Sequence, residues 1–220
     1  MPVVQIVAAK ALSSAAILIF LTLLLLASAK RLSTCIVLFG FQSAVLAANV
    51  LAVAYVYHTA EAWAVAAMVI AVKVVGIPYA LLRMIDKLQV ARHVESSIKP
   101  ALSVFITVGM ILLSFSAVQT YLADLQFPKE TMAAAIALIL SGAFLMVSRK
   151  KAIMQIVSLL VLENGIFMAA LTTTFGMPLI IEIGVVFDLI VGVFLMGIFA
   201  FRIRDTFEHL DVSRLRRLRG

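Results

Sequence analysis

The sequence has little charge and almost no cysteine. Only 13% of its 220 residues are charged, about half the share found in soluble domains, and one cysteine, Cys35, lies inside an apolar run. A single cysteine excludes an intramolecular disulfide and is too few to hold an iron–sulfur cluster. The sequence also lacks metal-ligand spacing, a glycine-rich phosphate loop and a nucleophile–base arrangement. We therefore expect no catalytic site, no metal site and no cofactor in this chain.

Apolar residues dominate what is present. They make up 64% of the chain, whereas a soluble domain is nearer half apolar. A bilayer-spanning helix needs roughly 20 apolar residues, and seven runs qualify. They cover about 11–29, 32–57, 62–84, 100–123, 131–147, 152–174 and 179–201. The sequence predicts an all-α, polytopic membrane protein with seven transmembrane helices, in contact with the lipid bilayer.

Basic residues are sorted by loop. Of the 18 Lys and Arg residues, 15 fall in the loops and the tail on one predicted side. The other side holds Lys10 and Lys129, and Lys73 lies within a span. Because cytoplasmic loops carry the excess of Lys and Arg, this partition places the N-terminus outside and the C-terminus in the cytoplasm. The net charge of +7 thus reflects orientation, and we expect no nucleic-acid partner.

Three ionisable residues lie deep within spans: Lys73, Glu163 and Asp188. A charged side chain at the centre of a spanning helix costs about 2.5–3.5 kcal/mol on insertion scales, so such residues usually face the protein interior and serve a function. At about 1.5 Å per residue from the cytoplasmic basic residues, all three lie within about 6 Å of one another in height, near the midplane. This common height predicts a proton or ion path that runs along the membrane plane.

The residue types suit proton transfer. Burial disfavours the anionic form of a carboxyl group, while a nearby ammonium group favours it. An acid held between these influences can exchange protons near neutral pH. Lys73 can therefore be a partner that sets this balance or a carrier itself, and the alternative is an ion pair that only holds helices together.

Four further polar residues are accessory candidates. Gln42, Asn49 and Asn164 can hold bridging waters between carriers, or they can simply form hydrogen bonds between helices. Glu182 lies about a turn from the outer end of its helix, where it is either an interfacial residue or an entry or exit group.

The last two predicted helices carry a recognisable pattern. Basic residues precede Glu163-Asn164 in the middle of the first arm, a short outer turn follows, and Asp188 with Gly192 occupies the second arm before a basic tail. This hairpin resembles the K-type small subunit of respiratory complex I and is similar to the C-type subunit of multisubunit cation/proton antiporters. Seven helices that end in such a hairpin are most similar to component E of the membrane-bound nickel–iron hydrogenases, the hydrogenase-4 and formate hydrogenlyase group.

The resemblance is specific over about 149–213, whereas the first 148 residues match in hydropathy and length only. It implies three parts: an N-terminal transmembrane region (1–148), a hairpin like that of the K-type subunit (149–202) and a basic cytoplasmic tail (203–220). Two departures stand out. The complex I subunit has a glutamate at the second acidic site, where this chain has Asp188, and Lys73 has no counterpart in that three-helix subunit.

What the resemblance implies is a non-catalytic membrane-arm subunit of a complex I-like hydrogenase in a prokaryotic cytoplasmic membrane. Glu163 and Asp188 would belong to the proton or sodium path that is coupled to redox chemistry. Its partners would be antiporter-like and other membrane-arm subunits, with the redox centres in partner subunits. Two alternatives remain open: a stand-alone secondary transporter, and a purely structural membrane subunit.

Overall fold

Helices account for most of the residues that the computed structural model describes, which are 2–57, 60–87, 94, 96–122 and 128–174. Within them, five helices are long and apolar enough to cross a bilayer: Leu32–Ala52, Trp63–Asp86, Pro100–Tyr121, Lys129–Ser148 and Ala152–Thr173. The segment Ala15–Ser28 is a shorter apolar helix. The protein is thus an integral, multi-pass membrane protein. The predicted run 179–201 and the predicted tail lie outside the described residues.

The helices follow the predicted apolar runs closely. They are α1 (Pro2–Ser28), α2 (Leu32–Tyr57), α3 (Ala60–Val69), η1 (Ile70–Gly76), α4 (Ile77–Lys87), α5 (Pro100–Tyr121), α6 (Lys129–Ser148) and α7 (Ala152–Thr174). The segments α3, η1 and α4 form one continuous helix, because the residues at both junctions keep helical backbone angles. The expected run 131–147 is extended at both ends in α6, which makes it a full-length span.

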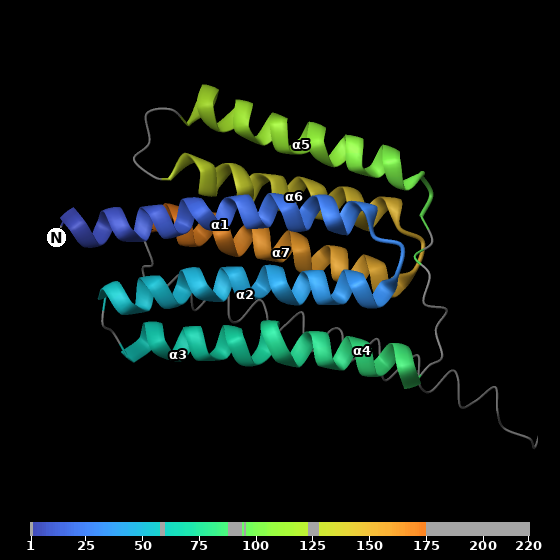
Figure 1. The fold of residues 1–220 in the computed structure, drawn as a ribbon, viewed down its shortest axis with the longest axis horizontal. Helices are drawn as coiled ribbons and strands as arrows, with labels where there is room; N and C mark the ends of the chain where they lie inside the picture. The colour runs from blue at the N-terminus through green and yellow to red at the C-terminus, as the bar shows by residue number, and fades with distance from the viewer. Residues whose placement is uncertain (1, 58–59, 88–93, 95, 123–127, 175–220) are drawn as a thin grey trace, which may run out of the picture. The chain divides into compact units, whose positions relative to one another are not determined.

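These helices pack side by side as a bundle (Figure 1). Both α1 and α7 lie between α2 and α6 and contact each of them. The long helix α3–η1–α4 packs against α2 at one edge, and α5 packs against α6 and α1 at the other. The most extensive contact is between α6 and α7. Consequently α7, which carries Glu163, is held from both sides by α2 and α6.

Two glycines allow α6 and α7 to approach closely. A Cβ atom on Gly142 of α6 would lie 2.6 Å from the backbone nitrogen of Leu162, next to Glu163. A Cβ atom on Gly165 of α7 would lie 2.7 Å from the Cβ of Leu138. Small residues permit such backbone contact between membrane helices. The two glycines therefore fix the height and rotation of α7 where it presents Glu163.

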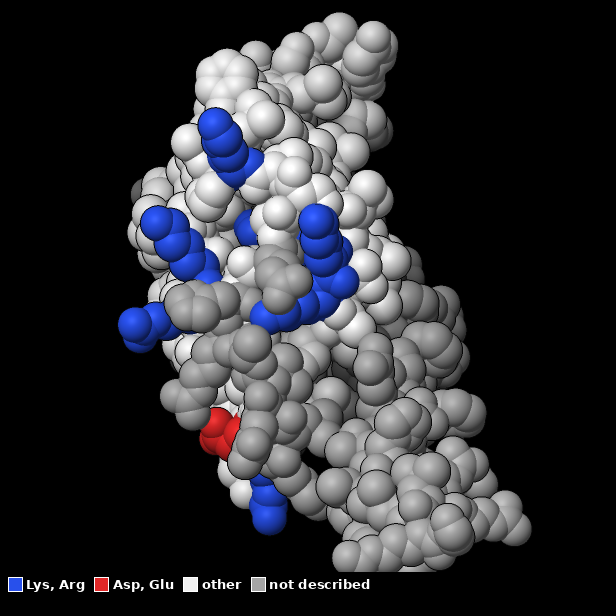
Figure 2. Space-filling view, turned by 90° about the vertical axis from the view of Figure 1, so that its right-hand side faces the viewer, with Lys and Arg blue, Asp and Glu red and all other residues white. Residues whose placement is uncertain are grey.

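Basic side chains gather at one end of the described bundle (Figure 2). Exposed Lys and Arg residues lie between α1 and α2, in the second half of α4, just before α5 and just before α7, namely Lys30, Arg31, Arg83, Lys99 and Lys150. The connections at this end are tied together, since the Val94 amide donates to the Lys30 carbonyl and the Ser97 amide donates to the Ser148 carbonyl. The loops that were predicted to share one side of the membrane thus meet at one end of the bundle.

Arg149 differs from the other basic residues at this end because it is buried, with 2% of its surface exposed. Its Nη2 atom donates to the carbonyl oxygen of Ala27, 2.9 Å away, in the last turn of α1. A cation at a helix C-terminus is favourable because the carbonyl groups there are unpaired. Burial lowers the pKa of the guanidinium, since desolvation disfavours the charged form, although arginine remains protonated at neutral pH. Arg149 thereby links the end of α1 to the connection between α6 and α7.

Candidate functional site

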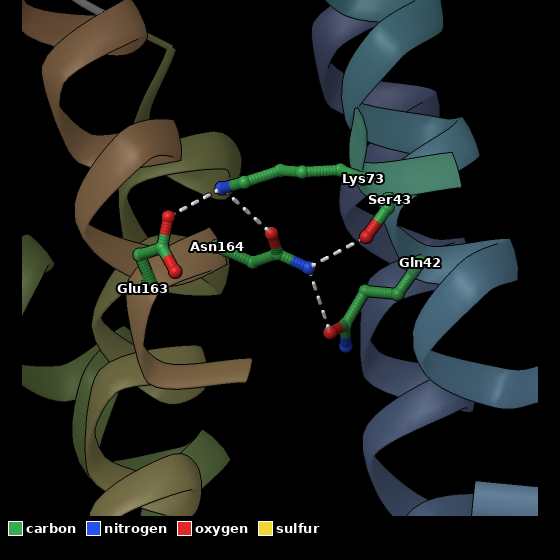
Figure 3. Close-up of polar contacts among 5 residues, drawn as sticks. All are labelled: Gln42, Ser43, Lys73, Glu163 and Asn164. Carbon is green, nitrogen blue, oxygen red and sulfur yellow. Dashed lines mark hydrogen bonds and ion pairs between the residues drawn. The ribbon is translucent and has the colours of Figure 1, made fainter. Parts of the chain in front are cut away.

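A buried lysine and a buried glutamate pair inside the bundle (Figure 3). Lys73 extends from η1 toward α7, and its Nζ atom lies 2.9 Å from Oε1 of Glu163. The two side chains are 1% and 3% exposed, so the pair is shielded from any solvent or lipid around the bundle. Buried charges are stable only when they are paired, and the attraction between two opposite charges is much stronger in a low-dielectric interior than in water. The sequence predicts a similar height for these two residues, and the structure places them in direct contact; their role in proton transfer stays a prediction.

Asn164 connects this pair to α2 (Figure 3). Its Oδ1 atom accepts a hydrogen bond of 3.4 Å from Lys73 Nζ. Its Nδ2 atom donates to Ser43 Oγ at 3.2 Å and to Gln42 Oε1 at 3.4 Å. Asn164 is fully buried and so is Ser43, while Gln42 is 1% exposed. Two neighbouring residues on α7 therefore make different contacts: Glu163 pairs with Lys73 of η1, and Asn164 joins Lys73 to Gln42 and Ser43 of α2.

The hydrogen bonds continue from α2 to α1. Gln42 Nε2 donates to Thr22 Oγ1 at 3.1 Å, and Thr22 Oγ1 donates to the carbonyl oxygen of Ile19 at 2.7 Å. From Lys73 onward, every donor in this series points in the same sense, toward α1. Aligned hydrogen bonds polarise one another and strengthen in a low dielectric. The result is a polarised chain of side chains that crosses α7, η1, α2 and α1 within the bundle.

Apolar packing closes the cluster on the side away from the basic end. Residues from α2, α3 and α7 form a hydrophobic core there, made of Ala47, Val50, Ala66, Val69, Phe167 and Leu171. The ring of Phe167, one turn beyond Glu163, has its centroid 5.3 Å from Lys73 Nζ, a cation–π distance. The polar chain therefore extends sideways through the bundle and is bounded by apolar packing on the side away from the basic end.

One oxygen of the glutamate is left over. Glu163 Oε2 is buried and has no hydrogen-bond partner among the described residues. Buried polar atoms in folded proteins nearly always have a partner, so an exception calls for an explanation. A carboxyl oxygen in this state can accept a proton, because neutralisation removes the penalty of leaving a buried anionic oxygen unpaired.

The structure brings together four of the seven predicted site residues: Lys73, Glu163, Asn164 and Gln42. Asn49 is also buried, but it donates to the carbonyl oxygen of Val45 in its own helix at 3.1 Å. The predicted residues Asp188 and Glu182 lie outside the described residues. Within the described ranges, no group of three or more His, Cys, Asp or Glu residues is placed to hold a metal ion.

Sequence reasoning missed Ser43 and Thr22, the two hydroxyl groups in the polar chain. Serine and threonine are common in membrane helices, where they bond to their own backbone, so their presence carries no specific signal. The only available indication was position: Ser43 adjoins Gln42, and Thr22 lies in the middle of the preceding apolar run.

Comparison with known proteins gives one informative result. No protein-family model matches the sequence, and no solved structure matches it. The chain is 32% identical over 158 residues to uncharacterized protein Rv0085 of Mycobacterium tuberculosis, an alignment that covers 71% of this chain and 72% of the relative. Identity at this level over more than two thirds of both chains shows common descent, and the protein belongs to the same family as this mycobacterial protein.

Proposed function

We propose that this protein is a non-catalytic membrane-arm subunit of a complex I-like hydrogenase or oxidoreductase, and that its buried polar chain forms part of a proton or sodium path. The observation that carries the proposal is the Lys73–Glu163 pair, which is almost fully buried and linked to side chains of two further helices. A membrane-embedded pair of this kind is expensive to maintain, which favours a functional role.

The direction of the polar chain supports a lateral path. A channel through a single subunit would need polar groups along the helix axes, from one membrane face to the other. Here the polar groups lie at one level and pass from helix to helix, and apolar residues pack next to them on the side away from the basic end. In this proposal the chain receives a proton from one neighbouring subunit and delivers it to another, within the membrane plane.

Individual residues have distinct roles in the proposal. Glu163 is the proton carrier, because its Oε2 has no other hydrogen-bond partner among the described residues. Lys73 balances the charge of the carboxylate from 2.9 Å and donates to Asn164. The amide and hydroxyl groups of Asn164, Gln42 and Thr22 orient this chain and the waters that would complete it. Asp188 is the proposed second acid, on the basis of the family resemblance of the last hairpin.

The proposal also includes the fuller topology and the setting. The chain has seven transmembrane helices with the N-terminus outside and the C-terminus in the cytoplasm of a prokaryotic cell, and it resides in the cytoplasmic membrane. Its partners are antiporter-like and other membrane-arm subunits, and the redox centres lie in partner subunits. The clustering of described basic residues at one end of the bundle supports this orientation.

The functional test is coupled proton transport in membrane vesicles that contain the assembled complex. We expect Glu163→Gln, and separately Asp188→Asn, to abolish transport while the subunit still co-purifies with its partners. Glu130→Gln is the matched control, because Glu130 is an exposed acid in the first turn of α6. Full transport with both site substitutions present would refute the relay and favour a purely structural subunit. Transport by the purified chain without partners would favour a stand-alone transporter.

The orientation is tested by labelling single cysteines in intact cells, in a Cys35→Ala background. A cysteine at Lys150 is expected to react only after the membrane is permeabilised, whereas one at Lys129 reacts with an impermeant reagent from outside. The reverse pattern would place the N-terminus in the cytoplasm.

A further inference from the structure

Lys73 lies in a π-helical turn. The segment η1 spans seven residues within the otherwise α-helical rod α3–η1–α4, and just after it the Ile77 amide donates to the Val72 carbonyl, five residues back. Such i→i−5 turns are rare and accommodate an extra residue within an α-helix. Lys73 is the one residue of η1 that is buried. The π-helical turn therefore lies at the same place in the helix as the buried ammonium group of Lys73.

Pro78 accounts for the change of register. Proline has no amide hydrogen, and in an α-helix its ring would collide with the carbonyl group four residues earlier, here that of Val74. Widening the preceding turn relieves this collision. Pro78 is buried against α2, where a Cβ atom on Gly40 would lie 3.2 Å from the proline Cγ. The absence of a side chain at Gly40 thus leaves room for the proline ring.

The spacing of buried residues shows what the extra residue achieves. Apart from Pro78 itself, the buried positions described along the rod are spaced by about one turn: Ala66, Val69, Lys73, Ile77, Leu81 and Ile85. The distance from 66 to 85 is 19 residues over five turns, whereas five α-helical turns contain about 18 residues. A regular α-helix would rotate one half of the rod by about 100° relative to the other. The two halves could not then both face α2 with Lys73 directed toward Glu163.

We propose that Pro78 and Gly40 are positioning residues that hold Lys73 against Glu163 by maintaining this π-turn. Neither residue touches the carboxylate. Pro78 sets the helical register, and Gly40 seats the proline ring on α2. The inference rests on the proposed function only in treating the Lys73–Glu163 pair as the working part of the site, and its test does not depend on transport.

A double-mutant cycle measures the Lys73–Glu163 interaction with Pro78 present and absent. The thermal unfolding midpoint of the full chain in lipid nanodiscs is compared for Lys73→Met, Glu163→Gln and the double variant. In the wild-type background, we expect the two single substitutions to be strongly non-additive. In the Pro78→Ala background, we expect them to become additive, because the helix returns to α-register and the pair separates. The control background is Pro100→Ala, since Pro100 is at the first turn of α5 and forces no such register change.

A second readout reports geometry directly. Dicyclohexylcarbodiimide enters membranes and activates buried carboxyl groups, and an adjacent amine then attacks to form an amide while the urea leaves. We expect wild-type protein to yield a Lys73–Glu163 cross-link, identified by peptide mass spectrometry. Gly40→Leu and Pro78→Ala should reduce its yield at least tenfold, whereas Gly109→Leu, at a position where an added Cβ meets no atom within 4 Å, should leave it unchanged.

The outcomes separate the two proposals. Persistent non-additivity and an unchanged cross-link in Pro78→Ala would overturn the positioning role, even if that variant is less stable. Loss of the non-additivity and of the cross-link in Pro78→Ala would support the positioning role. If Glu163→Gln then transported protons normally, the relay alone would be refuted.

Discussion

Removing one charge of the Lys73–Glu163 pair is expected to be more damaging than removing both. In Glu163→Gln, the Lys73 ammonium stays 1% exposed inside the bundle and has lost the carboxylate that lies 2.9 Å away in the native protein. Breaking a buried ion pair by removing one partner costs about 3–5 kcal/mol, because the charge that stays buried loses a counter-charge. For a chain of this size, that corresponds to a decrease of about 6–20 °C in the unfolding midpoint.

The double variant Lys73→Met with Glu163→Gln should behave differently. Replacing a buried ion pair by well-packed hydrophobic residues of similar volume is often neutral or stabilising, and this double variant likewise leaves neither charge of the pair in the bundle. The expected unfolding midpoint in lipid nanodiscs is therefore close to that of the wild-type protein, with each single variant well below it. Glu130→Gln, at an exposed position, controls for the loss of a negative charge as such. If the double variant were as unstable as the sum of both singles, the two residues would not be coupled, and the reasoning from burial and distance would be refuted.

Two further predictions concern packing and the basic end. Gly142→Ala is expected to destabilise the fold by about 1–3 kcal/mol, since its Cβ would lie 2.6 Å from the backbone of Leu162, whereas Gly109→Ala has open space and should have no such cost. Equal unfolding midpoints for the two variants would contradict the close contact of α6 and α7. Arg149→Met should cost about 1–3 kcal/mol, because it removes a charged hydrogen bond to the end of α1, while Lys150→Met, at an exposed position, should have little effect. Hydrogen exchange at the C-terminal turn of α1 would show whether that loss is local.

The sequence predicts the positions of the described helices well. A spanning helix must match the thickness of the bilayer, and basic residues collect in the loops between spans, so both features can be read from the sequence. Heights counted along the chain also placed Lys73 and Glu163 at one level, and the 2.9 Å contact agrees. Counting gives height but not which helices are neighbours. The bridging role of Asn164 between α7, η1 and α2 therefore needed the packing of the bundle.

Other features had weak or no sequence signals. Pro78 within the run 62–84 indicates a local break in helical bonding, but not that the break takes a π-helical form beneath Lys73. Arg149 lies in a connection between helices, where the sequence predicts it. Its hydrogen bond to the Ala27 carbonyl joins residues 122 apart in sequence, so no sequence pattern indicates that contact. Thr22 is one of many hydroxyl groups in the apolar runs, and only its contact with Gln42 distinguishes it.

The most direct test of the account is proton translocation by vesicles that carry the Lys73→Met, Glu163→Gln double variant in the assembled complex. This variant is expected to fold and assemble like the wild-type protein, so a transport defect would not arise from instability. We expect normal assembly with no coupled proton movement. Proton translocation at the wild-type rate would contradict it and reduce the buried pair to a structural contact between helices.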